Sequence, residues 1–331
     1  MDPKEQAAVE LGSSSSSNKS EKIKKKKNKS SSSSSNITEE SNDLVGDWEG
    51  DLPNLDEFDT SIIEPDFTIS LFGMRRTGKS FFMRFILSMM IKYFTRVIVL
   101  SNTSMNGYWQ QYIPVESVFT GWRPAVVQAI LEIQRQKVLF YRDKIESGEY
   151  NASICIILDD IISDPELWKD PVLNKLFQEG RHYKICVMLA SQYAKGIAPC
   201  VRGNTDLAVI FATTQKLQIK SLTEDYFGRM PLRQGEALLV KNTRDNKAIV
   251  ILNKKRTGIT NKDIFWCLAK DPGSFIIGTE LAWKDDPRYE KLKRGEKLTQ
   301  QDAYDALRVQ EIERVEKEKA KRRKQISGIF A

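Results

Sequence analysis

The sequence has little of what zinc-binding and disulfide-bonded proteins need. It contains one histidine, His182, and four cysteines without CxxC spacing, so no cluster of these residues predicts a zinc site. Cys155 and Cys186 fall inside apolar, strand-like runs, which is typical of buried thiols in a reducing compartment. The sequence therefore argues against a zinc protein and against a small disulfide-stabilised secreted domain.

Long hydrophobic runs are also missing. The best candidate for a membrane span, residues 81–94, is too short and contains Arg84 and Lys92. The N-terminal MDPKEQAAVE lacks the apolar core of a signal peptide. We therefore expect no membrane span, and a protein that works in the cytosol or nucleus or inside a particle assembled there.

Charge is distributed unevenly along the chain. The net charge is +7 over 331 residues, but residues 1–66 hold 8 Lys/Arg against 15 Asp/Glu, which leaves +14 on residues 67–331. So much positive charge on residues 67–331, which we call the basic body, suggests a polyanionic partner. The alternative interpretation is that this charge only keeps the protein soluble.

Residues 1–60 are expected to form a disordered tail that is rich in Ser and Lys and then acidic. Two serine runs flank the basic block KSEKIKKKKNK, and an acidic stretch follows. Such a composition buries too little apolar surface to offset the entropy cost of ordering. The basic block fits a nuclear-import signal, a nucleic-acid tether or a solvated tail. Apolar residues of the acidic stretch are expected to contact a partner or the basic body: Leu44, Trp48, Leu52, Leu55 and Phe58.

From residue 67 onward, strand-like and helix-like segments alternate. The strand-like runs are continuously apolar, as expected when helices cover both faces of a parallel sheet. They span residues 67–72, 96–101, 154–160, 185–192 and 207–213, and the helix-like segments include residues 81–94, 125–146 and 167–181. We predict an α/β fold whose core, residues 61–255, is a mostly parallel central sheet between layers of helices.

The rest of the chain is expected to add to this core. Residues 237–241 and 248–254, joined by NTRDN, predict an antiparallel β-hairpin. Residues 256–331, which we call the C-terminal extension, are rich in charge and predict helices.

The segment GMRRTGKS, residues 73–80, matches the P-loop pattern GxxxxGK[ST] between a strand-like and a helix-like run. Glycines at 73 and 78 let backbone N–H groups surround phosphate oxygens. Lys79 supplies positive charge to the β- and γ-phosphates, and Ser80 offers a hydroxyl to Mg²⁺. We predict a nucleotide site formed by Gly73, Met74, Arg75, Arg76, Thr77, Gly78, Lys79, Ser80 and Phe81.

Two carboxylates, Asp159 and Asp160, end the apolar run ICIILDD. Carboxylates at the end of a buried strand are costly unless they meet a cation, so the first is expected to hold Mg²⁺, together with Ser80, and the second to activate water. Glu179 is the alternative to Asp160 as the general base.

Further polar residues follow the next apolar runs. Gln192 ends the run 185–192 and is expected to sense the γ-phosphate or to orient water. Arg202, in an expected loop before the following strand, is a candidate arginine finger that neutralises transition-state charge. Arg75 and Arg76 are alternatives within the P-loop itself.

The chain resembles the genome-packaging ATPases of large nucleocytoplasmic DNA viruses, of the poxvirus type. The resemblance lies in four motifs in this order: the P-loop, ICIILDD, GRHYKICVMLASQ and APCVRGNTDLAVIF. These ATPases are a viral branch of the FtsK/HerA superfamily of P-loop ATPases, and the resemblance covers residues 66–255. It implies a RecA-like core with an extra strand between the P-loop strand and the carboxylate strand. It also implies ATP and Mg²⁺ as cofactors, with Gln192 as the sensor and Arg202 as the finger supplied to a neighbouring subunit. Cellular relatives carry Glu where this chain has Asp160.

The resemblance implies an ATP-driven ring of subunits that packages double-stranded DNA into a preformed capsid, independently of DNA sequence. Its expected partners are duplex DNA, further copies of the chain and a capsid or vertex protein. Its expected place is the virus assembly site in the host cytoplasm, with the virion and the nucleus as alternatives. Candidates for contact with DNA are residues 102–111, with Tyr108 and Trp109, and residues 121–124. The alternative hypotheses are a helicase-like ATPase of replication or repair and a slow nucleotide-binding assembly scaffold.

Overall fold

The computed structural model describes residues 50–161, 165–194, 197–253 and 259–329, which centre on one nine-stranded sheet. The strand order is β1-β9-β8-β7-β2-β6-β5-β3-β4. The strands are β1 (Asp56–Glu57), β2 (Thr68–Phe72), β3 (Arg96–Ser101), β4 (Val118–Thr120), β5 (Ile154–Asp159), β6 (Ile185–Ser191), β7 (Leu207–Ile210), β8 (Ala248–Leu252) and β9 (Ile264–Cys267). All neighbouring strands are parallel except β8, which is antiparallel to β7 and to β9.

The predicted α/β fold with a mostly parallel sheet is confirmed. All residues of β2, β5 and β6 are buried, as their continuous apolar sequence requires. The extra strand implied by the resemblance is β6, which pairs with β2 on one side and with β5 on the other. The carboxyl ends of these three strands therefore lie next to one another.

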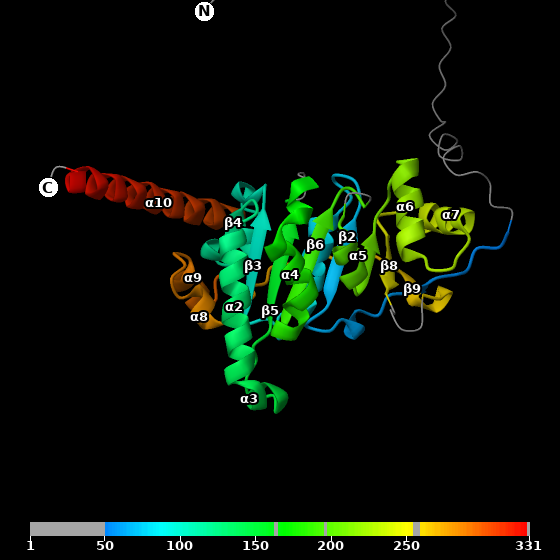
Figure 1. The fold of residues 1–331 in the computed structure, drawn as a ribbon, viewed down its shortest axis with the longest axis horizontal. Coiled ribbons are helices and arrows are strands. Elements are labelled where there is room, and N and C mark those ends of the chain that lie inside the picture. The colour runs from blue at the N-terminus through cyan, green and yellow to red at the C-terminus, as the bar shows by residue number, and fades with distance from the viewer. Residues whose placement is uncertain (1–49, 162–164, 195–196, 254–258, 330–331) are drawn as a thin grey trace, which may run out of the picture. The chain divides into compact units, whose positions relative to one another are not determined.

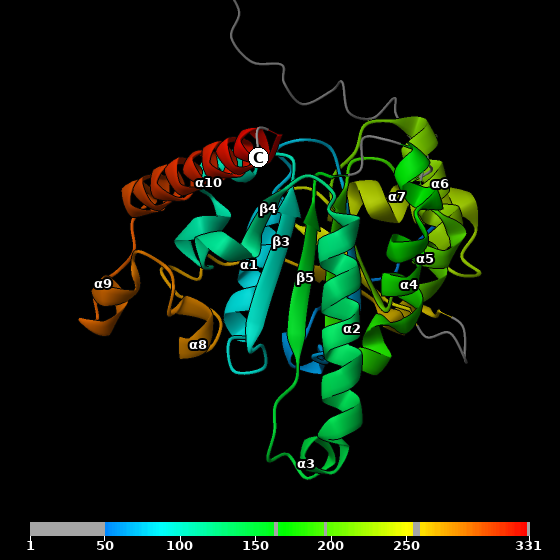
Figure 2. The ribbon, with the colours of Figure 1, turned by 60° about the vertical axis from the view of Figure 1, so that its left-hand side comes forward.

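Helices cover both faces of the sheet (Figures 1 and 2). One face packs against apolar residues of α2, α4, α5, α6 and α7, and the other packs against α1 and the segment around Trp109 and Ile113. The α-helices are α1 (Lys79–Met89), α2 (Pro124–Phe140), α3 (Arg142–Glu146), α4 (Pro171–Glu179), α5 (Pro199–Asn204), α6 (Lys216–Tyr226), α7 (Leu232–Asn242), α8 (Glu280–Trp283), α9 (Tyr289–Lys293) and α10 (Gln300–Ile329). Short 3₁₀ helices are η1 (Thr60–Ile62), η2 (Ser104–Asn106), η3 (Trp109–Gln111), η4 (Val115–Ser117), η5 (Pro165–Lys169), η6 (Gly180–Tyr183) and η7 (Asn261–Asp263).

The predicted hairpin of residues 237–241 and 248–254 is wrong, because residues 237–241 belong to helix α7. The buried residues of α7 are Gly235, Leu238 and Leu239, which follow helical spacing, but a short apolar run does not distinguish a strand from a buried helix turn. At Gly235 a Cβ atom would lie 2.3 Å from Thr223 Cγ2 of α6, so glycine permits the close approach of these two helices. The antiparallel hairpin is formed by β8 and β9 instead.

Parts of the N-terminal segment and of the C-terminal extension also pack on the sheet. Leu52 and Leu55 pack against the core, Phe58 is buried in it, and β1 pairs with β9. These three residues thus contact the basic body, whereas Leu44, Trp48 and the rest of the expected disordered tail up to residue 49 lie outside the described residues. Within the described ranges, no helix is both long enough and apolar enough to cross a membrane.

Candidate nucleotide-binding site

The predicted P-loop connects β2 to α1 at the carboxyl edge of the parallel strands. It forms one wall of a cleft of about 300 Å³, which we call the P-loop cleft. The ends of β5 and β6 contribute Asp159, Asp160 and Gln192 to the same cleft. The residues that line it are Arg75, Arg76, Gly78, Lys79, Ser80, Phe81, Thr103, Tyr108, Asp159, Asp160 and Gln192.

Two glycines of the P-loop are required by its backbone. A Cβ atom at Gly73 would lie 2.7 Å from both Phe211 Cβ and Thr77 Oγ1. Gly78 has a φ of +94°, in the left-handed region that residues with a Cβ rarely adopt. Gly78 is also the N-cap of α1, so the first free N–H groups of this helix face the cleft, where they can bind an anion.

Lys79 places its ammonium group on the P-loop itself. Its Nζ donates hydrogen bonds of 2.7 Å to the carbonyl oxygens of Gly73 and Met74. Burial lowers the pKa of Lys79, and the nearby Asp160 and Asp159 oppose that shift. A phosphate in the cleft would supply a stronger partner for this ammonium than the two carbonyls do.

Ser80 and Asp159 form a pair that fits Mg²⁺. The Ser80 hydroxyl lies 3.3 Å from Asp159 Oδ1 and 3.2 Å from Oδ2. Neighbouring ligands of an octahedral Mg²⁺ ion lie about 3 Å apart, so one ion can contact both groups. Asp159 is buried, and this burial raises its pKa despite hydrogen bonds from Trp109 and Ser80. A cation would stabilise the charged form of this carboxylate.

Asp160 is held in an unusual backbone conformation. The strand was expected to reach residue 160, but it ends at Asp159, and Asp160 has a φ of +53°. Its Oδ1 accepts a 2.7 Å hydrogen bond from Gln192 Nε2, and its carbonyl oxygen accepts one of 2.9 Å from Asn102 Nδ2. Gln218 Nε2 in turn donates to the carbonyl oxygen of Gln192. The carboxylate predicted to activate water and the predicted sensor are therefore in direct contact.

Glu179, the alternative base, is not brought into the P-loop cleft. It is the last residue of α4, and its carboxylate accepts a 2.7 Å hydrogen bond from Tyr183 just before β6 begins. The seven residues of β6 separate this position from Gln192 by about 20 Å. Glu179 therefore lies near the amino ends of the parallel strands, whereas Lys79 lies at their carboxyl ends.

Arg202 lies on helix α5 rather than in the loop expected for it. Its guanidinium is paired with Asp225 of α6 at 3.1 Å and does not line the P-loop cleft of its own chain. A role as a finger toward a neighbouring subunit stays a prediction. Arg75 and Arg76, the alternatives, do line the cleft.

A protein-family model matches the part of the chain that contains the P-loop cleft. The family model described as "Poxvirus A32 protein" matches residues 56–256, from β1 through the P-loop and both strand-end carboxylates to the segment after β8. The chain belongs to the poxvirus A32 protein family. The family resemblance inferred from the sequence motifs is therefore confirmed.

Individual proteins to which this chain is similar come from several viruses. The uncharacterized protein L437 of Acanthamoeba polyphaga mimivirus is 27% identical over 72% of this chain and 89% of its own length. The uncharacterized protein 075L of Invertebrate iridescent virus 6 is 26% identical over 59% of this chain and 78% of its own. Among solved structures, the genome packaging NTPase B204 of Sulfolobus turreted icosahedral virus 2, in complex with AMPPCP, is 14% identical with a TM-score of 0.42, over 61% of this chain and 97% of that one.

Sequence reasoning did not predict the contact of Trp109 with Asp159, nor that Thr103 and Tyr108 line the P-loop cleft. Trp109, proposed for contact with DNA, is only 2% exposed, and its Nε1 donates a 2.9 Å hydrogen bond to Asp159 Oδ2. Trp122, in the other candidate segment, packs against the core and donates to Asp170 Oδ2 at 2.8 Å. The N–H groups of both indoles therefore bind within the chain, and contact of these two segments with DNA stays a prediction. An isolated Trp between two strands carries no local signal for contact with a carboxylate 50 residues away.

Proposed function

We propose that this chain hydrolyses ATP with Mg²⁺ in the P-loop cleft and uses the energy to move double-stranded DNA into a virus particle. The observation that carries the proposal is the convergence of Lys79, Ser80, Asp159 and Asp160 in one cleft. Membership of the A32 family supports it.

Five side chains of the P-loop cleft have a chemical task in this proposal: Lys79, Ser80, Asp159, Asp160 and Gln192. The P-loop N–H groups and Lys79 bind the phosphates, and Ser80 and Asp159 would hold Mg²⁺, which when bound neutralises charge on the β- and γ-phosphates. Asp160, oriented by Gln192, accepts a proton from the attacking water. Arg202 of a neighbouring subunit would add positive charge in the transition state.

DNA movement requires contacts that do not depend on base sequence. The charge of +14 on residues 67–331 suits binding to the phosphate backbone, which is electrostatic and sensitive to salt. In this proposal several copies of the chain form a ring around the duplex, a capsid or vertex protein docks the ring, and the assembly works at the site of virus assembly in the host cytoplasm.

ATP turnover with and without DNA tests the proposal. We expect blunt-ended duplex DNA to increase turnover many-fold, single-stranded DNA of equal length to do so less, and the mass in solution to rise with a non-hydrolysable ATP analogue. Stronger stimulation by single strands would instead favour a helicase-like enzyme. Slow turnover that DNA leaves unchanged, in a protein that stays monomeric, would favour an assembly scaffold and contradict the proposal.

A further inference from the structure

The carboxylate of Asp159 has a second fixed partner besides Ser80, the indole of Trp109. Trp109 lies in η3, within the connection between β3 and β4, and is buried. Its ring packs edge-on against Tyr108, with 5.2 Å between ring centroids. The indole N–H therefore points at Asp159 Oδ2 from a side chain that has little freedom to turn.

An indole is well suited to orient a metal-binding carboxylate. It donates one hydrogen bond and offers no acceptor, so it cannot become a metal ligand itself. By occupying one position on Oδ2, Trp109 fixes the rotation of the Asp159 carboxylate and leaves its remaining lone pairs for Ser80 and for a cation. Partners that orient metal ligands in this way commonly change metal affinity 10- to 100-fold when they are lost.

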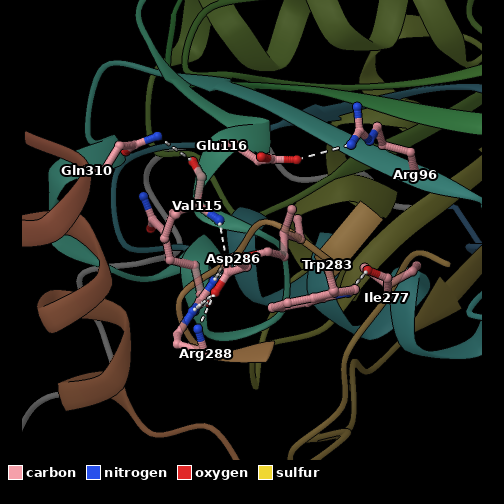
Figure 3. A network of polar contacts seen from close by, with 10 residues as sticks. Arg96, Val115, Glu116, Ile277, Trp283, Asp286, Arg288 and Gln310 are labelled. Carbon is pink, nitrogen blue, oxygen red and sulfur yellow. Dashed lines mark hydrogen bonds and ion pairs between the residues drawn. The ribbon is translucent and has the colours of Figure 1, made fainter. Parts of the chain in front are cut away.

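The segment that follows Trp109 is held by the C-terminal extension, and Figure 3 shows Val115 of this segment beside Asp286 and Arg288. Arg288 donates hydrogen bonds to the carbonyl oxygens of Gln110 and Ile113, the latter at 3.2 Å. Asp286 Oδ2 accepts a 2.9 Å hydrogen bond from the N–H of Val115. Backbone groups on the carboxyl side of Trp109 are thus fixed by two residues that lie more than 170 positions further along the chain.

Asp286 and Arg288 form a buried ion pair, each 4% exposed. The guanidinium contacts both carboxylate oxygens, at 2.7 and 2.6 Å, and lies over the ring of Trp283 at 5.2 Å. Because desolvation offsets most of the attraction in a buried ion pair, such a pair contributes little net stability compared with apolar packing. Its specific contribution here is to satisfy backbone groups of the segment that carries Trp109.

The same segment is also held from two further elements. Gln310 of α10 donates to the carbonyl oxygen of Val115 at 3.3 Å, and Arg96 of β3 pairs with Glu116 at 3.1 Å (Figure 3). Val115 is therefore fixed through its N–H by Asp286 and through its carbonyl by Gln310. A displacement of the C-terminal extension would reach Trp109 through these contacts.

We propose that Trp109 is a positioning residue for Asp159, and that the C-terminal extension keeps it in place through the Asp286–Arg288 pair. The inference deepens the proposed function, on which it rests: the Mg²⁺ requirement of the P-loop cleft depends on residues of the C-terminal extension. A partner that displaces the extension would thereby weaken Mg²⁺ binding.

The first test replaces the indole by a ring without an N–H. Wild type, Trp109→Phe and Trp122→Phe are titrated with Mg²⁺ at a fixed, saturating concentration of a non-hydrolysable ATP analogue, and binding is followed as a rise in unfolding temperature. Trp122→Phe is the matched control, because it also removes an indole N–H from an aspartate, but outside the P-loop cleft. We expect Trp109→Phe to need about tenfold more Mg²⁺ for half-saturation. Trp122→Phe should match wild type, and binding of the analogue without Mg²⁺ should be equal in all three proteins.

The second test leaves Trp109 in place and weakens its support. Arg288→Lys keeps the charge but replaces the planar guanidinium, whose separate nitrogens contact both oxygens of Asp286 and two carbonyl oxygens, by a single ammonium group. We expect a several-fold rise in the Mg²⁺ needed for half-saturation, and no further rise when Arg288→Lys is added to Trp109→Phe, because both act through one contact. The control is Arg294→Lys, an exposed arginine of the extension that pairs with Glu296 at 2.6 Å.

The outcomes separate this inference from the proposed function. If the analogue fails to bind wild type, the proposed function is wrong and the inference falls with it. If the analogue binds but Trp109→Phe has the Mg²⁺ requirement of wild type, only the inference is overturned. If Arg288→Lys lowers the unfolding temperature without changing the Mg²⁺ requirement, the ion pair serves structure alone and its proposed link to Asp159 is wrong.

Discussion

The P-loop cleft and the C-terminal extension are built in different ways. The cleft collects side chains that stand at the ends of neighbouring parallel strands, so its residues follow short motifs in the sequence. The extension joins the sheet through β9, which pairs with β8 and β1, and its later part attaches through buried polar contacts between segments far apart in the sequence, such as those of Arg288. The difference teaches that the residues lining the cleft can be predicted from local sequence motifs. The long-range contacts that hold those residues in place cannot.

The largest effect is expected when the charge of Lys79 is removed from the P-loop cleft and the contacts of the C-terminal extension are left intact. Lys79→Met should lower ATP turnover about a thousandfold, because Lys79 stabilises charge that develops on the phosphates. Duplex binding and unfolding temperature should stay near those of wild type, as should all properties of Lys92→Met, which changes an exposed lysine shortly after α1. Turnover within a few-fold of wild type in Lys79→Met would show that the reaction takes place elsewhere.

A second comparison sets Asp160, at the carboxyl ends of the parallel strands, against Glu179, near their amino ends. Asp160→Asn should lower turnover about a hundredfold, since the amide cannot accept a proton from water. Glu179→Gln should leave turnover unchanged. Steady-state phosphate release measures both variants, and a large loss in Glu179→Gln with none in Asp160→Asn would reverse the assignment of the base.

Stability should distinguish the packed body from the exposed face of the extension. Leu131→Ala, in α2, removes a side chain that is 1% exposed and should lower the free energy of unfolding by about 3 kcal/mol. Leu281→Ala, in α8, removes one that is 76% exposed and should cost less than about 0.5 kcal/mol. Urea unfolding measures both. If both substitutions lowered the free energy of unfolding equally, Leu281 would have to be buried against another part of the protein or a second molecule in solution.

The smallest expected effect is the pH dependence of the contact at the start of α10. Lys291 and the backbone of Thr299 lower the pKa of Asp302 to about 2. Because this folded-state pKa is below the ordinary value of about 4, the stabilisation is present above pH 4 and is lost as the pH falls toward 2.

Asp302→Asn should therefore cost about 1 kcal/mol or less at pH 7, since solvent screens the pair, and the difference from wild type should vanish near pH 2. Urea unfolding at several pH values measures it. A difference that persists unchanged at pH 2 would assign the effect to something other than the charge of Asp302.

Much of the fold and of the cleft could be predicted because the signals are local. The five strand-like runs became β2, β3, β5, β6 and β7, since continuous apolar runs bounded by polar residues are typical of buried parallel strands. The P-loop pattern and the residues that end β5 and β6 placed Lys79, Asp159 and Gln192 at one edge. Their convergence follows from strand order, which the family resemblance implied.

What could not be predicted depends on contacts between distant segments. Residues 237–241 belong to helix α7 and not to the predicted strand, because a short apolar run does not by itself distinguish a strand from a buried helix turn. Trp109 meets a carboxylate 50 residues away, and Arg288 meets a carbonyl group 178 residues away. The left-handed backbone of Asp160 is stabilised by Gln192 and Asn102, which lie in other loops.

The most direct test of the account is an experimental structure of the chain with Mg²⁺ and a non-hydrolysable ATP analogue. The account predicts the γ-phosphate beside Lys79 Nζ, Mg²⁺ between Ser80 and Asp159, and the Asp160 carboxylate facing a water in line with the γ-phosphate. A nucleotide bound away from residues 73–80, or an Asp159 carboxylate turned away from the metal, would contradict it.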